Sequence, residues 1–268
     1  MAGVALFGAI LFWGCGQQGG TSTSGGGALG SDAASKVYVA PGEYDEFYAF
    51  MSGGFSGQVS VHGLPSGRLF KIIPVFSVDG EKGWGFNEET KPMLNTSHGF
   101  VPWDDAHHPE LSQTNGETDG RWLFINANNT PRIARIDLSV FETTEIIEIP
   151  NSGGNHSSPF CTENTEYVVA GTRFGVPYPQ KDVAIDSYAE NFKGMLTFVK
   201  ADEPGNMDIA FQVLLPAFDY DLAHAGKGKS HGWVFFTTYN TEQKHSLLEV
   251  TASQNDKDFI AAVNWKKA

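Results

Sequence analysis

The sequence predicts an all-β fold, and three features predict it. Past residue 36, short β-prone runs alternate with turn residues and show little helical periodicity. Of the 268 residues, 41% are hydrophobic and 13% are aromatic, which is enough to bury a large core. A histidine-bearing segment also recurs after 48 positions, at His108 and His156. Many short strands with recurring turns indicate a sandwich, a barrel or a propeller.

The first 15 residues are predicted to form an export signal. The uncharged apolar run at 3–13 is too short to span a membrane comfortably, but it has the length of the central region of a secretory signal. It ends at Gly14 and Cys15, which together resemble the lipobox of bacterial lipoproteins, where the cysteine carries the lipid. We therefore expect a periplasmic protein or one held at the outer face of the cytoplasmic membrane, with Cys15 as the lipidation site.

A tether and one folded domain are expected to follow. Between residues 16 and 30, seven of fifteen positions are glycine and most others are Ser, Thr or Gln, so this segment has almost nothing to bury. We predict a flexible tether over 16–35 and a β-rich domain over 36–268. Cys161 is the one cysteine within that domain, and we expect it to be a buried structural thiol.

The acidic balance of the chain limits its partners. The formal net charge of −13 provides no basic stripe that could displace counterions from phosphates, so we expect no nucleic-acid partner. Two interpretations of the acidic surface remain. It is either simply solvated or a docking surface for a basic electron-transfer partner.

The spacing of the predicted strands favours a propeller. Nine runs are predicted as strands: 57–61, 69–76, 122–126, 132–138, 145–149, 167–171, 194–199, 210–215 and 233–238. The 48-residue repeat holds roughly four strands and is close to the length of a propeller blade. The innermost strands of a propeller line its channel, so histidines where these strands start would face one another at one channel mouth.

His107, His108 and His156 are therefore a candidate transition-metal site, because neutral imidazole suits copper, zinc, nickel and iron. The alternative is structural, since neighbours on a strand point to opposite faces and one histidine of the pair would then be buried and the other exposed. Two adjacent ligands require an irregular turn, with which Pro109 is compatible. We expect His62 to lie in a loop, because turn residues follow it.

Several ordered segments resemble nitrous oxide reductase. They are Asp-Asp-Ala-His-His-Pro at 104–109, Asp-Gly-Arg-Trp-Leu-Phe-Ile-Asn at 119–126, Thr-Pro-Arg-Ile-Ala-Arg at 130–135, and Glu-Ile-Pro-Asn at 148–151 leading to His156. The similarity continues to 238–242. The resemblance implies a seven-bladed β-propeller followed by a cupredoxin domain, assembled as a homodimer. It also implies reduction of nitrous oxide to dinitrogen and water at a tetranuclear copper-sulfide cluster.

The resemblance also implies roles for individual residues. His107, His108 and His156 match the first three cluster ligands, and Asp105 matches a carboxylate that orients a ligating imidazole. In the family, a structural calcium ion lies between the cluster and the dinuclear copper centre that delivers electrons. Its ligands match Tyr239, Glu242 and Asp256, together with the backbone carbonyl of Val250; oxygen ligands suit this cation.

At this spacing the chain holds about four or five blades, and the cupredoxin domain with its dinuclear copper centre has no counterpart. We therefore expect an N-terminal fragment of a longer reductase, inactive by itself, whose whole form takes electrons from a cytochrome c or a cupredoxin. The alternative is a non-catalytic β-propeller lipoprotein, a binding module whose histidines only pack together. Fold alone does not decide between the two.

Overall fold

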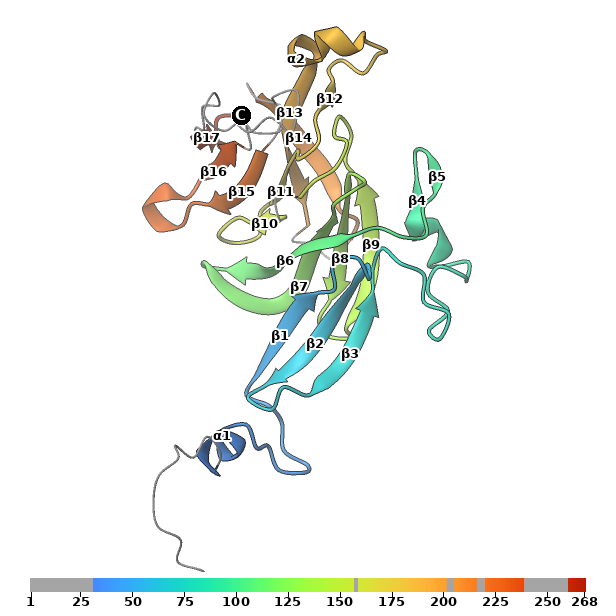
Figure 1. Cartoon of the computed structure of the whole chain (residues 1–268). Coiled ribbons are helices and arrows are strands. Elements are labelled where there is room, and N and C mark those ends of the chain that lie inside the picture. The colour runs from blue at the N-terminus through green and yellow to red at the C-terminus, as the bar shows by residue number, and fades with distance from the viewer. Residues whose placement is uncertain (1–30, 157–158, 202–204, 216–219, 239–259) are drawn as a thin grey trace, which may run out of the picture. The chain divides into compact units, whose positions relative to one another are not determined.

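The computed structural model describes residues 31–156, 159–201, 205–215, 220–238 and 260–268 (Figure 1). The chain divides into two compact units, residues 1–38 and 39–268. In the first, the described structure is the short helix α1 (Ser31–Lys36). The regular secondary structure of the second is mainly antiparallel strand, which confirms the predicted all-β class.

The first two large sheets are meanders of consecutive strands. Sheet 1 has the order β1 (Phe47–Ser52), β2 (Gln58–Leu64) and β3 (Leu69–Pro74). The 3₁₀ helix η1 (Lys91–Leu94) and the small hairpin of β4 (Asn95–Thr96) and β5 (Gly99–Phe100) follow it. Sheet 2 has the order β6 (Ala106–Thr114), β7 (Glu117–Ala127), β8 (Arg132–Asp137) and β9 (Glu142–Glu148).

Two further sheets complete the second unit. Sheet 3 contains β10 (Phe160–Cys161), β11 (Val168–Gly171), β12 (Val176–Pro177), β13 (Phe192–Lys200) and β14 (Asp208–Leu215), with β13 paired to β11, β12 and β14. The short helices η2 (Ile185–Ser187) and α2 (Tyr188–Asn191) precede β13. Sheet 4 has the order β15 (Tyr220–Ala225), β16 (Trp233–Thr238) and β17 (Ile260–Asn264), with η3 (Gly228–Ser230) between β15 and β16.

All nine predicted strands coincide with observed ones: β2, β3, β7, β8, β9, β11, β13, β14 and β16. The expectation that His62 lies in a loop was wrong. His62 is inside β2 and pairs with Ala49 of β1, because the strand continues to Leu64 before the chain turns. The buried position of Cys161 is confirmed by its 2% exposure.

Apolar side chains that alternate along the strands join each sheet to the next. In β7, Leu123 and Ile125 pack with Val59 and Ile73 of sheet 1. Phe124 points to the opposite face and joins a cluster with β11 and β13. A third cluster connects sheet 3 with sheet 4. Burial of each large apolar side chain stabilises the fold by about 1.5–3 kcal/mol, so these interfaces hold each sheet against the next one along the chain.

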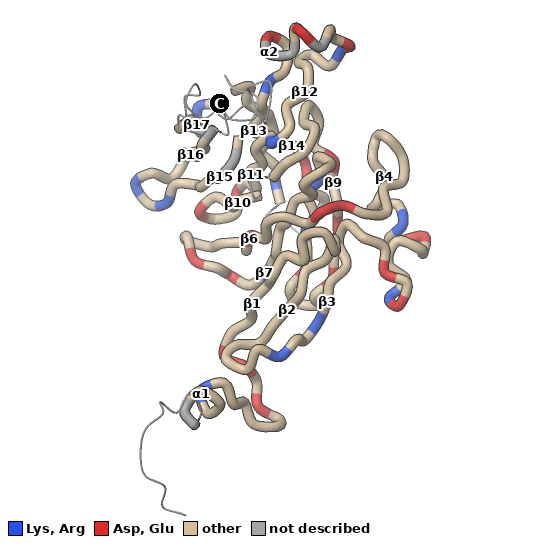
Figure 2. The backbone as a smooth tube through the Cα atoms, viewed as in Figure 1, with Lys and Arg blue, Asp and Glu red and all other residues tan. Residues whose placement is uncertain are grey.

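Two arginines of sheet 2 are buried beside these clusters, Arg132 over the ring of Phe76 and Arg135 over that of Trp122. Figure 2 shows the acidic residues of the second unit at several separate strands and turns along the backbone. Among the residues that the structure describes, no helix has the length and apolar character needed to cross a membrane.

Candidate metal centre

The first strand of sheet 2 begins at the histidine pair. Ala106 pairs with Ala127 of β7 and His107 with Asn126, and the register then shifts between His107 and Glu110. A shift of this kind re-aims side chains and breaks the strict alternation of a strand. The irregular backbone that two adjacent ligands require is therefore present, and it lies inside β6.

The third histidine lies at the equivalent place before sheet 3. His156 is four residues ahead of β10, in a segment that approaches the turn after β11. There the backbone amide of Arg173 donates to the carbonyl of Gly154 at 2.9 Å, and the amide of Gly153 donates to the carbonyl of Phe174 at 2.8 Å. These bonds hold the residues just before His156.

The three imidazoles converge. The ring centroids of His107 and His108 lie 4.8 Å apart, those of His107 and His156 5.1 Å apart, and those of His108 and His156 5.0 Å apart. One nitrogen of each ring lies within 4.8 Å of the others. His107 and His156 are partly buried and His108 is exposed, so the cluster opens to solvent on one side.

This geometry fits a transition-metal centre. Nitrogen ligands lie about 2.0–2.1 Å from the metal, so two ligands of one ion are at most roughly 4.2 Å apart. The nitrogens need to close by less than about 1 Å to share an ion, and their present spacing also suits ligands of neighbouring ions. An all-imidazole donor set matches copper, zinc, nickel and iron.

Asp105 lies against one of the rings. Its Oδ1 lies 2.8 Å from Nδ1 of His107. This contact does not have hydrogen-bond geometry, and neither atom has a hydrogen-bond partner among the described residues. Asp105 is only 3% exposed, so the pair is shielded from water. A carboxylate beside Nδ1 leaves Nε2 of His107 as the nitrogen available to a metal.

Asp104, which sequence reasoning did not single out, forms a buried hub beside Asp105. Its carboxylate lies 3.3 Å from the guanidinium of Arg132, and the two residues are 1% and 0% exposed. Burial lowers the pKa of Arg132, and the charge of Asp104 opposes this effect. In the sequence, Asp104 is visible only as the first aspartate of the Asp-Asp-Ala-His-His segment, and its partner Arg132 lies 28 residues away.

The remaining predicted site residues are not placed. Tyr239, Glu242, Val250 and Asp256, expected at a calcium site, lie outside the described residues, as does Cys15. The calcium site and the lipidation site therefore stay predictions from the sequence.

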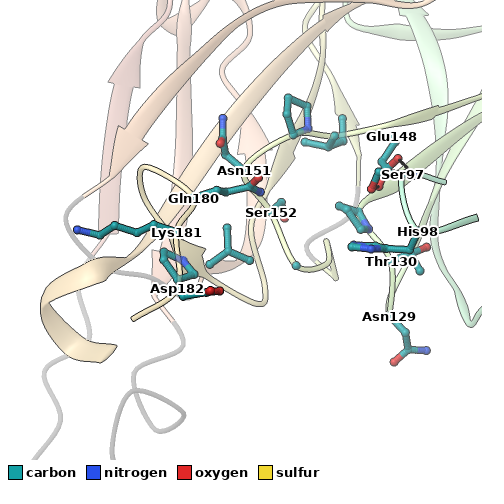
Figure 3. A pocket seen from close by; sticks show the side chains of 16 residues that line it. Ser97, His98, Asn129, Thr130, Glu148, Asn151, Ser152, Gln180, Lys181 and Asp182 are labelled. Carbon is teal, nitrogen blue, oxygen red and sulfur yellow. Dashed lines mark hydrogen bonds between the residues drawn. The ribbon is translucent and has the colours of Figure 1, made fainter. Parts of the chain in front are cut away.

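A cavity of about 850 Å³ lies beside the loops that lead to the histidines, and none of the three histidines lines it (Figure 3). In this view Lys181 and Asp182 lie across the cavity from Ser97 and Glu148. The carboxylate of Glu148 accepts hydrogen bonds from the amide and the hydroxyl of Ser97, at 2.6 and 2.7 Å, and Asn151 donates to Gln212. Because these groups are already bonded to protein, the cavity offers weaker support for a ligand site than the histidines do.

Comparison with known proteins relates this sequence to one group of enzymes. No family model matches the sequence. The nitrous-oxide reductase of Pseudomonas fluorescens is 34% identical over 262 residues, which cover 97% of this chain and 40% of that protein. The nitrous-oxide reductase of Stutzerimonas stutzeri is 34% identical over 230 residues, covering 85% of this chain and 35% of the relative. That of Cupriavidus necator is 32% identical over 248 residues, covering 88% and 37%.

Among solved structures, a hydrazine synthase from Kuenenia stuttgartiensis aligns with a TM-score of 0.48 and 11% identity, covering 81% of this chain and 47% of that one. The sequence relationship is much closer. The Asp-Asp-Ala-His-His segment and His156 lie within a chain that matches nitrous-oxide reductases over most of its length. This chain is thus a homologue of the nitrous-oxide reductases and spans 40% of the length of the Pseudomonas fluorescens relative.

Proposed function

We propose that this chain is part of a copper-dependent nitrous-oxide reductase and that His107, His108 and His156 are ligands of its tetranuclear copper-sulfide cluster. The observation that carries the proposal is the convergence of these three imidazoles, from the starts of two successive sheets, in a homologue of nitrous-oxide reductases. The reaction of the whole protein would convert nitrous oxide, two electrons and two protons to dinitrogen and water.

The residues of this chain would hold and orient the cofactor. His107 would ligate through Nε2, because Asp105 occupies its Nδ1 side. The exposed side of His108 leaves a path for a small substrate to reach the cluster. When bound, the reduced copper ions supply the electron density that activation of nitrous oxide, a poor ligand, demands. The buried Asp105 and the bulge in β6 keep the ligands in place.

Further parts of the proposal concern the whole protein. The successive packing of four sheets supports a propeller, which we propose to have seven blades as in the resembled family. We also propose calcium at Tyr239, Glu242, Asp256 and the carbonyl of Val250. The electron donor would be a cytochrome c or a cupredoxin, and the assembly a periplasmic homodimer, either free or anchored through Cys15.

Copper binding tests the ligand assignment. In the whole reductase, His156→Ala is expected to lower bound copper and to abolish nitrous oxide reduction, because it removes one cluster ligand. His98→Ala is the matched control, since His98 is exposed and outside the cluster. Copper content by elemental analysis and activity are measured on both variants.

If His156→Ala kept the copper content and activity of the parent protein, the ligand assignment would be wrong. A whole protein that neither binds copper nor reduces nitrous oxide would instead favour the non-catalytic binding module.

A further inference from the structure

We infer that the turn between β7 and β8, residues 128–131, is the scaffold that sets the distance between the His107–His108 pair and His156. In this role Asp104, Asn129 and Gly154 are positioning residues for the candidate metal centre. The inference rests on the proposed function only in taking the three histidines as metal ligands.

One side of the turn holds the segment that carries the histidine pair. The backbone amide of Asn128 donates to the carbonyl of Asp105 at 2.8 Å, and its side-chain amide donates to the carboxylate of Asp105 at 3.3 Å. Asp105 in turn contacts Nδ1 of His107 at 2.8 Å. Movement of the turn would therefore move His107.

The buried carboxylate of Asp104 connects the turn to the start of β6 through hydrogen bonds. It accepts the backbone amide of Asn129 at 3.0 Å, the side-chain amide of Asn129 at 3.1 Å and the backbone amide of Asp105 at 2.7 Å. It also accepts the hydroxyl of Thr130, and Nε of Arg132 donates to that hydroxyl at 2.7 Å. A buried charge with this many partners is costly to displace, so it fixes one arrangement.

The other side of the turn contacts the segment that carries His156. A Cβ atom on Gly154 would lie 2.5 Å from the carbonyl oxygen of Asn128 and 2.8 Å from Cδ2 of Phe174. The two backbones approach this closely only because residue 154 has no side chain. On the far side of Gly154, Ser152 Oγ and the side-chain amide of Asn155 are hydrogen-bonded at 2.9 Å. The segment before His156 is thus held by its close contact with the turn and by the hydrogen bond between Ser152 and Asn155.

The experiment compares Gly154→Ala with Gly80→Ala in the full 268-residue chain. A Cβ at Gly80 meets nothing within 4 Å, so that substitution adds the same methyl group without a clash. With Cu²⁺ as the probe, Gly154→Ala is expected to bind roughly 10–100-fold more weakly and to show a changed electron paramagnetic resonance spectrum. Gly80→Ala should bind as the parent chain does. Thermal melting checks that each variant is folded at the temperature used.

A second readout needs no metal. In a Cys15→Ser background, the substitutions His107→Cys and His156→Cys place two thiols at the cluster, and dibromobimane crosslinks them at a rate that depends on their distance. Adding Gly154→Ala should slow the crosslink at least several-fold, and adding Gly80→Ala should not. Should Gly154→Ala fail to fold, Asn129→Ala replaces it. That change removes one hydrogen bond of Asp104 at an exposed residue, so a smaller effect in the same direction is expected.

Equal copper affinity and equal crosslinking in Gly154→Ala and Gly80→Ala would overturn the scaffold inference and leave the metal site intact. A parent chain that binds no Cu²⁺, but whose crosslink is slowed by Gly154→Ala, would contradict metal binding by the three histidines of this chain and support the scaffold.

Discussion

Glu166 shows how one side chain can join separate segments of the chain. Its carboxylate accepts hydrogen bonds from the hydroxyl of Thr162 at 2.6 Å and from the amide of Asn164 at 3.1 Å, and it lies 2.7 Å from Nε2 of His231. The ring of His231 meets Trp265 edge to face at 5.4 Å. The turn after β10, the turn before β16 and the end of β17 are therefore linked through this carboxylate.

The pKa of Glu166 predicts acid sensitivity of this link. Burial alone would raise that pKa, but hydrogen bonds from the Thr162 hydroxyl, a backbone amide and His231 outweigh it and lower the pKa to about 2. A carboxyl with a lowered pKa contributes stability above its ordinary value of 4.5, and this contribution is lost as the pH falls from there toward 2. Glu166→Gln should therefore lower the free energy of unfolding by about 1–3 kcal/mol at pH 7, reduced by solvent screening.

Urea unfolding at pH 7 and pH 3 measures this effect. The variant should lose less stability than the parent between the two pH values. Glu117→Gln, at an exposed position, is the control and should behave as the parent does. An unchanged pH dependence in Glu166→Gln would contradict the prediction.

The strand β7 illustrates how an element connects two neighbours. Ile125 faces sheet 1, while Phe124 faces the cluster shared with sheet 3, because successive side chains of a strand point to opposite faces. Both side chains are 0% exposed. The start of β6 is paired to the end of this strand, so the position of His107 depends on a well-packed β7.

Truncation of either face of β7 should be costly. We expect Ile125→Ala to destabilise the protein by about 2–5 kcal/mol and Phe124→Ala by about 3–5 kcal/mol, since each leaves a cavity in a packed interface. Thr118→Ala, at an exposed position of the same strand, should cost less than about 0.5 kcal/mol. Chemical unfolding of the three variants makes the comparison, and a cost below about 1 kcal/mol for Phe124→Ala would show that the two sheets do not pack through it.

At the scale of the whole molecule, the series of four sheets has apolar residues on both outer faces. On sheet 1, Phe47 and Met51 share the face opposite the core and are 62% and 50% exposed. On sheet 4, Phe235 and Ile260 also share the face opposite the core, and they are 37% and 69% exposed. Contiguous exposed apolar faces are uncommon on soluble monomers and usually mark a contact surface.

The exposed faces predict dye binding by the folded chain. We expect the 268-residue chain to enhance the fluorescence of a hydrophobic dye such as anilinonaphthalene sulfonate before any unfolding. Phe47→Lys combined with Phe235→Lys should reduce the enhancement by roughly half, because each change places a charge within one face. The melting temperature of the double variant is the control for folding. Fluorescence equal to that of a compact control protein would contradict the prediction.

Much of the strand content could be predicted from local pattern. Runs such as 122–126 and 194–199 are apolar and β-prone, and they became the buried strands β7 and β13. Other strands were missed for a physical reason. β6 begins with Ala-His-His-Pro-Glu, which has low strand propensity, and it is held in the sheet by pairing with β7. His62 was misplaced because β2 ends at Leu64, three positions after the predicted end of this strand at residue 61.

The sequence by itself determined the all-β class, the strands with strong apolar runs and the identity of the three histidines, because these depend on residue type and spacing along the chain. Only the tertiary structure decided that the three rings meet, that β6 is bulged between His107 and Glu110, and that Asp104 pairs with Arg132. The physical reason is that burial preference is encoded locally. Contacts between remote side chains depend on strand register and sheet packing, which the whole folded chain sets together.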